Sequence, residues 1–72
     1  MPRIAAIGEL LRIQGFGLAG AVVCAADSPV EVRAAWDGLP VDVTVVVLTP
    51  PAAAALADVT RPSARLTVVM SP

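Results

Sequence analysis

Three glycines near the start of the chain form a pattern that is associated with nucleotide chemistry. Gly15, Gly17 and Gly20 have the G-x-G-x-x-G spacing of a dinucleotide-binding loop. In such a site a strand leads directly into the glycines, and a helix begins among them so that its free amides meet the pyrophosphate. Here residues 9–16 look helical, and a strand-like apolar run follows Gly20. This reversed order disfavours a phosphate site.

An alternative assignment makes residues 11–14 the strand and residues 18–26 the helix. The strand would then be very short, and the helix would contain two consecutive valines, which are poor helix formers. An acidic residue placed to bind the ribose, about 20 residues further on, also has no good candidate. Binding of a nucleotide or another small ligand by residues 15–20 is therefore the second hypothesis, not the first.

The remaining reactive side chains do not form a catalytic group. The chain has one cysteine and no histidine, which excludes an intrachain disulfide, a cysteine metal cluster and histidine-dependent catalysis. Cys24 lies in an apolar run and is predicted to be a buried structural thiol. A phosphoacceptor site needs clustered carboxylates at strand ends and a lysine, but only Glu9 is suitably placed and the chain has no lysine. We expect neither enzyme activity nor a cofactor.

The composition favours a small domain that works with a protein partner. The 72 residues predict one domain, residues 1–72, which is near the lower size limit for a core without disulfides or metals. The chain is 57% hydrophobic and 15% charged, and so little charge cannot cover a small surface. Its net charge of −1 and its two aromatic residues do not fit a nucleic-acid binder.

No stretch of the sequence predicts a membrane span. The longest charge-free runs, residues 13–26 and 43–57, are shorter than the roughly 20 apolar residues that a span needs. The apolar run between Arg3 and Glu9 is also too short for a signal peptide. We therefore expect a cytoplasmic protein.

The first half of the chain predicts two strands separated by a helix. Residues 4–7 form a short apolar run that is typical of a strand covered on both faces. Residues 9–17 follow as a helix, in which Leu10 and Ile13 share one apolar face. Residues 21–26 are again apolar and β-branched, and they predict the second strand.

A second helix is predicted from residue 29 to about residue 37. The segment Ser28-Pro29-Val30-Glu31 has a hydroxyl N-cap, a proline at the first helical position, and a glutamate that can reach back to the amide of the cap. Asp27 is expected to shape the loop before this cap. Gly38 is predicted to adopt the left-handed conformation that ends a helix. The expected buried face consists of Val32, Ala35, Trp36 and Leu39.

The second half of the chain predicts a third strand and a short helix. Residues 41–48 are rich in β-branched side chains and should form an interior strand, the most buried of the sheet. Thr49-Pro50-Pro51 then begins an alanine-rich helix over residues 52–57, with Leu56 facing inward. Asp58 opposes the helix dipole, so we expect that end to fray.

Residues 60–63 are predicted to be a loop, and residues 65–70 a fourth strand. Strands that alternate with helices through short links predict a parallel sheet with helices on both faces. The expected fold is therefore α/β, a small receiver-like (flavodoxin-like) three-layer fold with a four-stranded parallel sheet and alternating helices.

Several segments, taken in order, resemble the F subunit of V-type and archaeal-type rotary ATPases. The most specific is Gly15-Phe16-Gly17-Leu18-Ala19-Gly20, which is similar to the family's Gly-Phe-x-Leu-x-Gly at the end of the first helix. The resemblance covers nearly the whole chain through IAAIGE, SPVEVRAAW, VDVTVVVLT and RLTVVMSP. It implies a non-catalytic rotor subunit on the coiled-coil shaft of the central stalk, peripheral to the membrane, in a complex that couples ATP hydrolysis or synthesis to ion transport.

The resemblance places partner binding on the first helix and the strand ends, at Glu9, Arg12, Gly15, Phe16, Gly17 and Leu18. The family commonly has a longer polar side chain at the position of Gly17, so one stalk contact is not implied. Its members also continue past the fourth strand into a C-terminal helix, whereas this sequence ends at Pro72. Without that helix the fourth strand would be an uncovered edge, which makes a homodimer through this strand a further hypothesis.

Overall fold

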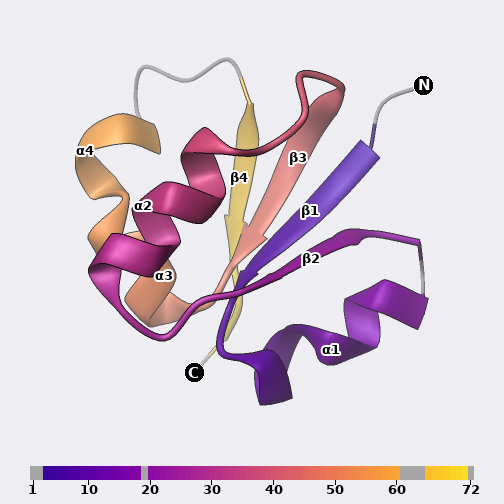
Figure 1. Cartoon of the computed structure of the whole chain (residues 1–72), viewed down its shortest axis with the longest axis horizontal. Helices are drawn as coiled ribbons and strands as arrows, with labels where there is room; N and C mark the ends of the chain where they lie inside the picture. The colour runs from indigo at the N-terminus through magenta and orange to yellow at the C-terminus, as the bar shows by residue number, and fades with distance from the viewer. Residues whose placement is uncertain (1–2, 19, 61–64, 72) are drawn as a thin grey trace.

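The computed structural model describes residues 3–18, 20–60 and 65–71, which form a layered α/β fold (Figure 1). The strands are β1 (Arg3–Gly8), β2 (Val22–Ala25), β3 (Val43–Leu48) and β4 (Leu66–Val69). The helices are α1 (Leu10–Leu18), α2 (Pro29–Asp37), α3 (Pro50–Ala55) and α4 (Ala57–Thr60). Strands and helices alternate as predicted, and α4 adds one turn after α3.

The four strands form a parallel sheet in the order β2-β1-β3-β4. This is the order of a flavodoxin-like sheet, in which the direction of chain travel across the sheet reverses between β1 and β3. The predicted fold class is therefore confirmed. The two inner strands are β1 and β3, and β2 and β4 form the edges.

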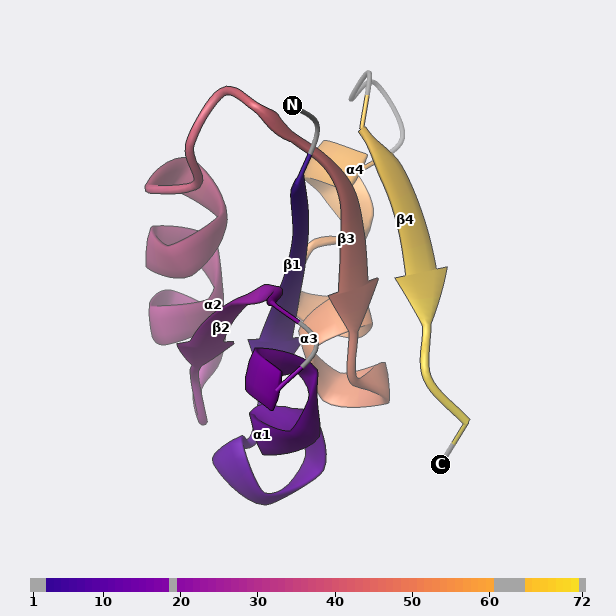
Figure 2. The ribbon, with the colours of Figure 1, turned by 90° about the vertical axis from the view of Figure 1, so that its right-hand side faces the viewer.

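Helices cover the two faces of the sheet unequally (Figure 2). On one side α1 packs alone against β1 and β2, while on the other side α2 and α3 pack against the sheet and against each other. Because side chains alternate along a strand, Ala5 and Ile7 point toward α2 and α3, and Ala6 points toward α1. Among the side chains of α1 that the structure describes, Ile13 is fully buried.

The main core lies between the sheet and the pair α2 and α3. Val32 and Leu39 are buried as predicted, and Leu56 is fully buried after the end of α3. Trp36 is only half-buried and packs against the edge of this core. Full burial of a side chain such as leucine stabilises a fold by about 1.5–3 kcal/mol, so these contacts fix α2 and α3 on the sheet.

The third strand begins two residues later than predicted. Val41 is 98% exposed and forms a turn with Asp42. The Arg3 side chain holds this turn, because its Nε and Nη2 donate to the two carboxylate oxygens of Asp42 at 2.7 and 3.0 Å. Pairing with β1 therefore starts only at Val43, and after an irregularity between Arg3 and Ile4 it is regular from Val45 onward.

The expectation that this third strand is the most buried of the sheet is wrong. β1 ends in four consecutive buried residues, whereas burial in β3 is interrupted. The reason is that α1 packs on one face of the sheet against β1 and β2. It does not cover that face of β3.

Two helix ends differ from the predictions. Gly38 has φ −88° and is not left-handed; its amide makes an ordinary helical bond to the carbonyl of Ala34 at 3.0 Å, and the next amide, that of Leu39, donates to the carbonyl of Trp36 at 3.3 Å instead of continuing the helical pattern. The chain after α3 does not fray at Asp58, which lies in the first turn of α4. Thr60, predicted to be in a loop, ends α4, and residues 61–63 of that predicted loop lie outside the described residues.

Gly8→Ala should destabilise the protein strongly, by about 2–4 kcal/mol, because a Cβ at this position would lie 2.3 Å from Cγ2 of Thr49. Gly15→Ala is the matched control. Nothing lies within 4 Å of a Cβ at Gly15, inside α1, so this change should stabilise the fold by about 0.5–1 kcal/mol. Urea unfolding followed by Trp36 fluorescence measures both, and equal effects would contradict the close contact at Gly8.

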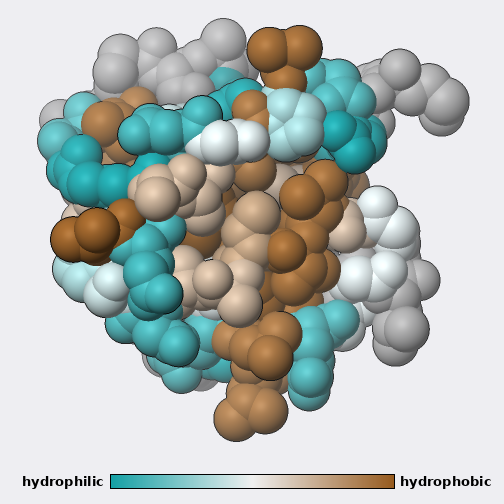
Figure 3. All heavy atoms as spheres, viewed as in Figure 1, coloured by the Kyte–Doolittle hydropathy of each residue, from teal (hydrophilic) through white to brown (hydrophobic). Residues whose placement is uncertain are grey.

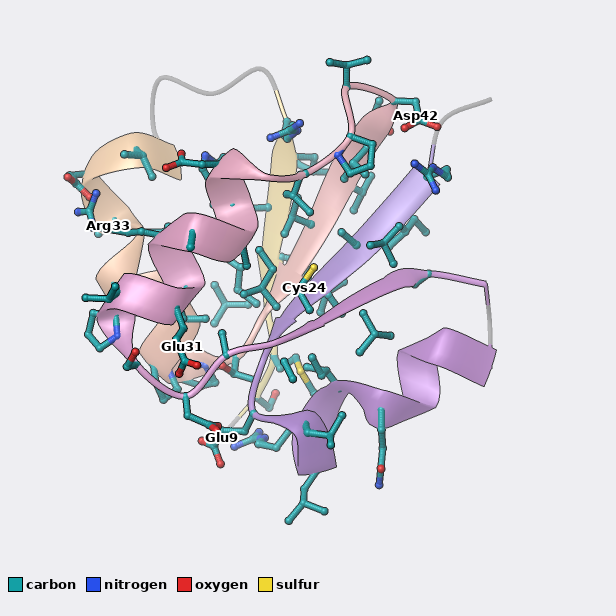
Figure 4. The ribbon with its side chains drawn as sticks, viewed as in Figure 1. Glu9, Cys24, Glu31, Arg33 and Asp42 are labelled. Carbon is teal, nitrogen blue, oxygen red and sulfur yellow. The ribbon has the colours of Figure 1, made fainter. Side chains whose placement is uncertain are left out.

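The ion pair between Arg33 of α2 and Asp58 of α4 should make the stability of the fold depend on pH. Arg33 Nη2 lies 2.7 Å from Asp58 Oδ1 (Figure 4 labels Arg33), and this hydrogen bond lowers the pKa of Asp58. Because the folded-state pKa is lowered, the stabilising effect is complete above the ordinary carboxyl pKa of about 3.9 and is lost as pH falls through the folded value.

An NMR titration of carboxyl carbons tests this linkage. Arg33→Gln should raise the pKa of Asp58 toward its ordinary value. The pKa of Asp42 should stay lowered in this variant, because the partner of that carboxylate is Arg3. An unchanged pKa of Asp58 in the variant would contradict its pairing with Arg33.

Candidate functional site

A pocket of about 340 Å³ opens at the end of the molecule where the strands of the sheet finish. In open α/β sheets, ligands bind at the carboxyl ends of the strands, beside the point where the strand order reverses. Here the reversal lies between β1 and β3, and the residues that follow these strands are Glu9 and Thr49. Both line the pocket, together with Ala26, Asp27, Ser28, Pro29, Val32, Pro51 and Ala52.

Backbone contacts at the strand ends hold the walls of this pocket together. The amide of Thr49 donates to the carbonyl of Ile7 at 3.2 Å, which joins the chain after β3 to β1. The amide of Ala26 donates to the carbonyl of Gly8 at 2.8 Å, which joins the chain after β2 to β1. Gly8 itself has no Cβ, so the Thr49 side chain can occupy the space beside it.

The second wall of the pocket is the N-terminus of α2, and it has the predicted capping box. The amide of Glu31 donates to Oγ of Ser28 at 3.2 Å. The Glu31 side chain reaches back as expected, but it accepts from the amide of Asp27 at 3.1 Å and not from that of Ser28. This pair of bonds fixes the loop that carries Asp27, one of the pocket residues that sequence reasoning missed.

The rim of the pocket is acidic. Figure 4 shows Glu9 and Glu31 at the same end of the molecule, where the strands finish. Glu9 and Asp27 form no ion pair among the residues that the structure describes, where the ion pairs are Arg3–Asp42 and Arg33–Asp58. No group of three or more acidic or cysteine side chains in this part of the chain could hold a metal ion.

One of the residues that line the pocket, Thr49, carries a nearly buried hydroxyl group. Thr49 is 1% exposed and occupies the N-cap position of α3, but its side chain makes no cap hydrogen bond. Its hydroxyl has no other hydrogen-bond partner within the described residues. The hydroxyl oxygen nevertheless keeps some exposure to solvent. Every fully buried side-chain oxygen in the described residues has a hydrogen-bond partner, and this oxygen has none.

The residues predicted to bind a partner are spread over the pocket rim and α1. Glu9 lines the pocket, while Arg12 donates to the carbonyl of Ser71 and so ties α1 to the chain after β4. Gly15 faces open space, and a Cβ at Gly17 would lie 3.4 Å from Val23 of β2. The backbones of Phe16 and Leu18 belong to α1, but their side chains lie outside the described residues. Partner binding by these residues stays a prediction.

Two exposed leucines at the start of α1 were not predicted as site residues. Leu10 is 53% and Leu11 84% exposed, so the expectation that Leu10 shares the buried face of Ile13 is wrong. The helix begins two residues after the end of β1. Figure 3 shows apolar atoms over this part of α1. Adjacent helical residues point about 100° apart, which is the signal that one of two neighbouring leucines had to face outward.

The glycines do not form a phosphate loop in this fold. Gly15 and Gly17 lie inside α1, and Gly20, with φ 85°, follows it. The helix begins at Leu10, before the glycines, so they lie toward the end that carries partial negative charge. A nucleotide phosphate would find neither free amides nor a favourable dipole there.

Cys24 is half-buried in β2, and burial raises the pKa of its thiol. A thiol with a raised pKa is protonated near neutral pH and is a poor nucleophile. The position therefore fits the predicted structural role, although the side chain is less buried than expected.

The fold and the site together define a small flavodoxin-like α/β domain with an acidic pocket and exposed leucines at the carboxyl edge of its sheet. Protein-family models, curated proteins and solved structures were compared with the chain, and none matched it. Among the described helices, none is both long and apolar enough to cross a membrane. The function is therefore inferred from the site.

The two N-caps should respond differently to removal of their hydroxyl groups. Ser28→Ala should lower the free energy of unfolding by about 1 kcal/mol, because Ser28 caps α2 through its side chain. Thr49→Val should change it by less than about 0.5 kcal/mol, since this hydroxyl makes no cap bond and valine has the same branched shape. Urea unfolding measures both variants. A large loss in Thr49→Val would show that the hydroxyl has a structural partner.

Proposed function

We propose that this chain is a non-catalytic docking subunit of the F-subunit type, which binds the coiled-coil central-stalk subunit of a V-type or archaeal-type rotary ATPase or ATP synthase. The observation that carries docking is the exposure of Leu10 and Leu11 next to the pocket rim. Exposed leucines that adjoin a pocket at a ligand-binding edge favour a protein interface.

The surroundings of the two leucines suit a protein partner. Glu9 precedes them and Arg12 follows them, so charged groups surround an apolar centre, as in typical interfaces. The bond from Arg12 to the carbonyl of Ser71 fixes the first turn of α1 against the rest of the molecule. A helix of the partner could pack its apolar stripe along α1 and present a side chain to the pocket.

The assignment to a rotary ATPase is supported by the motif and the fold. The segment Gly15-Phe16-Gly17-Leu18-Ala19-Gly20 is similar to the family's motif, and it occurs at the end of the first helix, where the family has it. The small parallel sheet is the fold that this resemblance implies. In this proposal the subunit turns with the rotor on the cytoplasmic side, while nucleotide chemistry and ion transport take place in other subunits.

A second candidate is a homodimer that pairs through β4. This strand lies at the edge of the sheet, and Leu66, Val68 and Val69 are all exposed large apolar residues on it. An exposed apolar edge strand can pair with a second copy of the chain. The stalk hypothesis stands first because the leucines adjoin the strand-end pocket, which a dimer through β4 would leave empty.

Co-expression with the coiled-coil stalk subunit from the same source should give a one-to-one complex by sizing chromatography with light scattering. Leu11→Asp should weaken this complex by about tenfold or more, because an exposed interface leucine would be lost. Val41→Asp is the matched control, since Val41 is equally exposed but lies in the turn before β3. This variant should bind normally.

Failure of the unmodified chain to bind the stalk subunit would overturn the proposal. The same light-scattering measurement on the chain alone tests the second candidate. A mass that stays at one copy over a wide concentration range counts against the homodimer.

A further inference from the structure

We infer that the pocket between Glu9 and Asp27 binds a basic side chain, the guanidinium of an arginine or the ammonium of a lysine, that a protein partner presents at this edge. The inference rests on the proposed function, because it specifies the chemistry by which the docked partner is recognised. It follows from three features of the pocket: its unneutralised rim, its apolar walls and its unpartnered hydroxyl.

The rim attracts a cation that the described part of the chain does not supply. Glu9 and Asp27 both line the pocket and have no ion-pair partner in that part. The arginines that the structure describes have contacts elsewhere. Arg3 pairs with Asp42 and Arg33 with Asp58, Arg12 bonds to the carbonyl of Ser71, and Arg65 bonds to the carbonyls of Val43 and Pro40 beneath the Trp36 ring.

The walls suit the stem of a long basic side chain. Between the acidic groups the lining is apolar, from Ala26, Val32 and Ala52 with Pro29 and Pro51. Arginine and lysine cover apolar surface with their methylene groups while the charged head meets polar partners. The volume of about 340 Å³ is at the small end of the range for ligand pockets. A single extended side chain fits this shape better than a large ligand would.

The hydroxyl of Thr49 completes the set of acceptors. Thr49 lines the pocket, and its hydroxyl has no hydrogen-bond partner among the described residues. A guanidinium carries five N–H donors and an ammonium three, so either can bond to carboxylates and a hydroxyl at once. An anion such as phosphate would meet two carboxylates instead, and the pocket therefore selects against it.

Titration of the ¹⁵N-labelled chain with N-acetyl-arginine methylamide tests this inference by NMR. Saturable shifts should appear at the amides of residues 26–28, 30–32, 49, 52 and 53, since the prolines between them have no N–H. The citrulline analogue, which has the same shape without the charge, should bind about tenfold more weakly or not at all. Equal binding of the two compounds, or shifts confined to other residues, would overturn the inference. Shifts at the pocket with MgCl₂ but not with the arginine compound would also overturn it.

Glu9→Gln and Asp27→Asn should each weaken binding of the arginine compound by about fivefold to tenfold. Asp37→Asn removes an equally exposed carboxylate from the far end of α2 and should have no effect. Thr49→Val should weaken binding while leaving stability unchanged, which separates recognition by the hydroxyl from a structural role. Unfolding curves of all four variants exclude loss of the fold as the cause.

The stalk complex separates this inference from the proposed function. If the complex forms and neither Glu9→Gln nor Asp27→Asn weakens it, the pocket inference fails and the docking proposal stands. If the arginine compound binds as expected but no stalk complex forms, the pocket inference stands and the stalk assignment fails.

Discussion

The close approach of Gly8 and Thr49 is the contact on which the carboxyl edge of this sheet depends. A Cβ at Gly8 would overlap the Thr49 side chain, so only glycine lets the end of β1 lie against the residue that follows β3. The backbone bonds from Thr49 to Ile7 and from Ala26 to Gly8 hold the same three strand ends together. This arrangement buries the Thr49 side chain at the wall of a pocket.

The binding edge follows from this contact and from the unequal layers of the fold. Because α2 and α3 cover one face together, their N-termini stand side by side and form the far wall of the pocket. α1 packs against β1 and β2 on the other face, and it begins two residues after the end of β1. Leu10 and Leu11 are exposed next to the acidic rim. Exposed apolar side chains and acidic side chains therefore lie on one edge of the molecule.

Local sequence patterns predicted the elements well, because the signals that define them are local. The apolar runs, the cap at Ser28 and the prolines placed the helices and strands in the right order. The errors arose where distant residues decide. The Arg3–Asp42 pair, which joins two distant segments, delays β3. Gly38 is an exception, because it lies next to its helix and still does not adopt the left-handed geometry. Glu9 was predicted as a site residue, but Asp27 and Thr49 join it only because the parallel strands end together.

The central claim is that the carboxyl edge of the sheet is a protein-docking surface. Hydrogen exchange of the chain, measured free and in the presence of the coiled-coil stalk subunit, tests it most directly. The account predicts added protection in the first turn of α1 and in the segments around Asp27 and Thr49, with no change in the turn at Val41. Protection confined to β4, or no added protection anywhere, would contradict it.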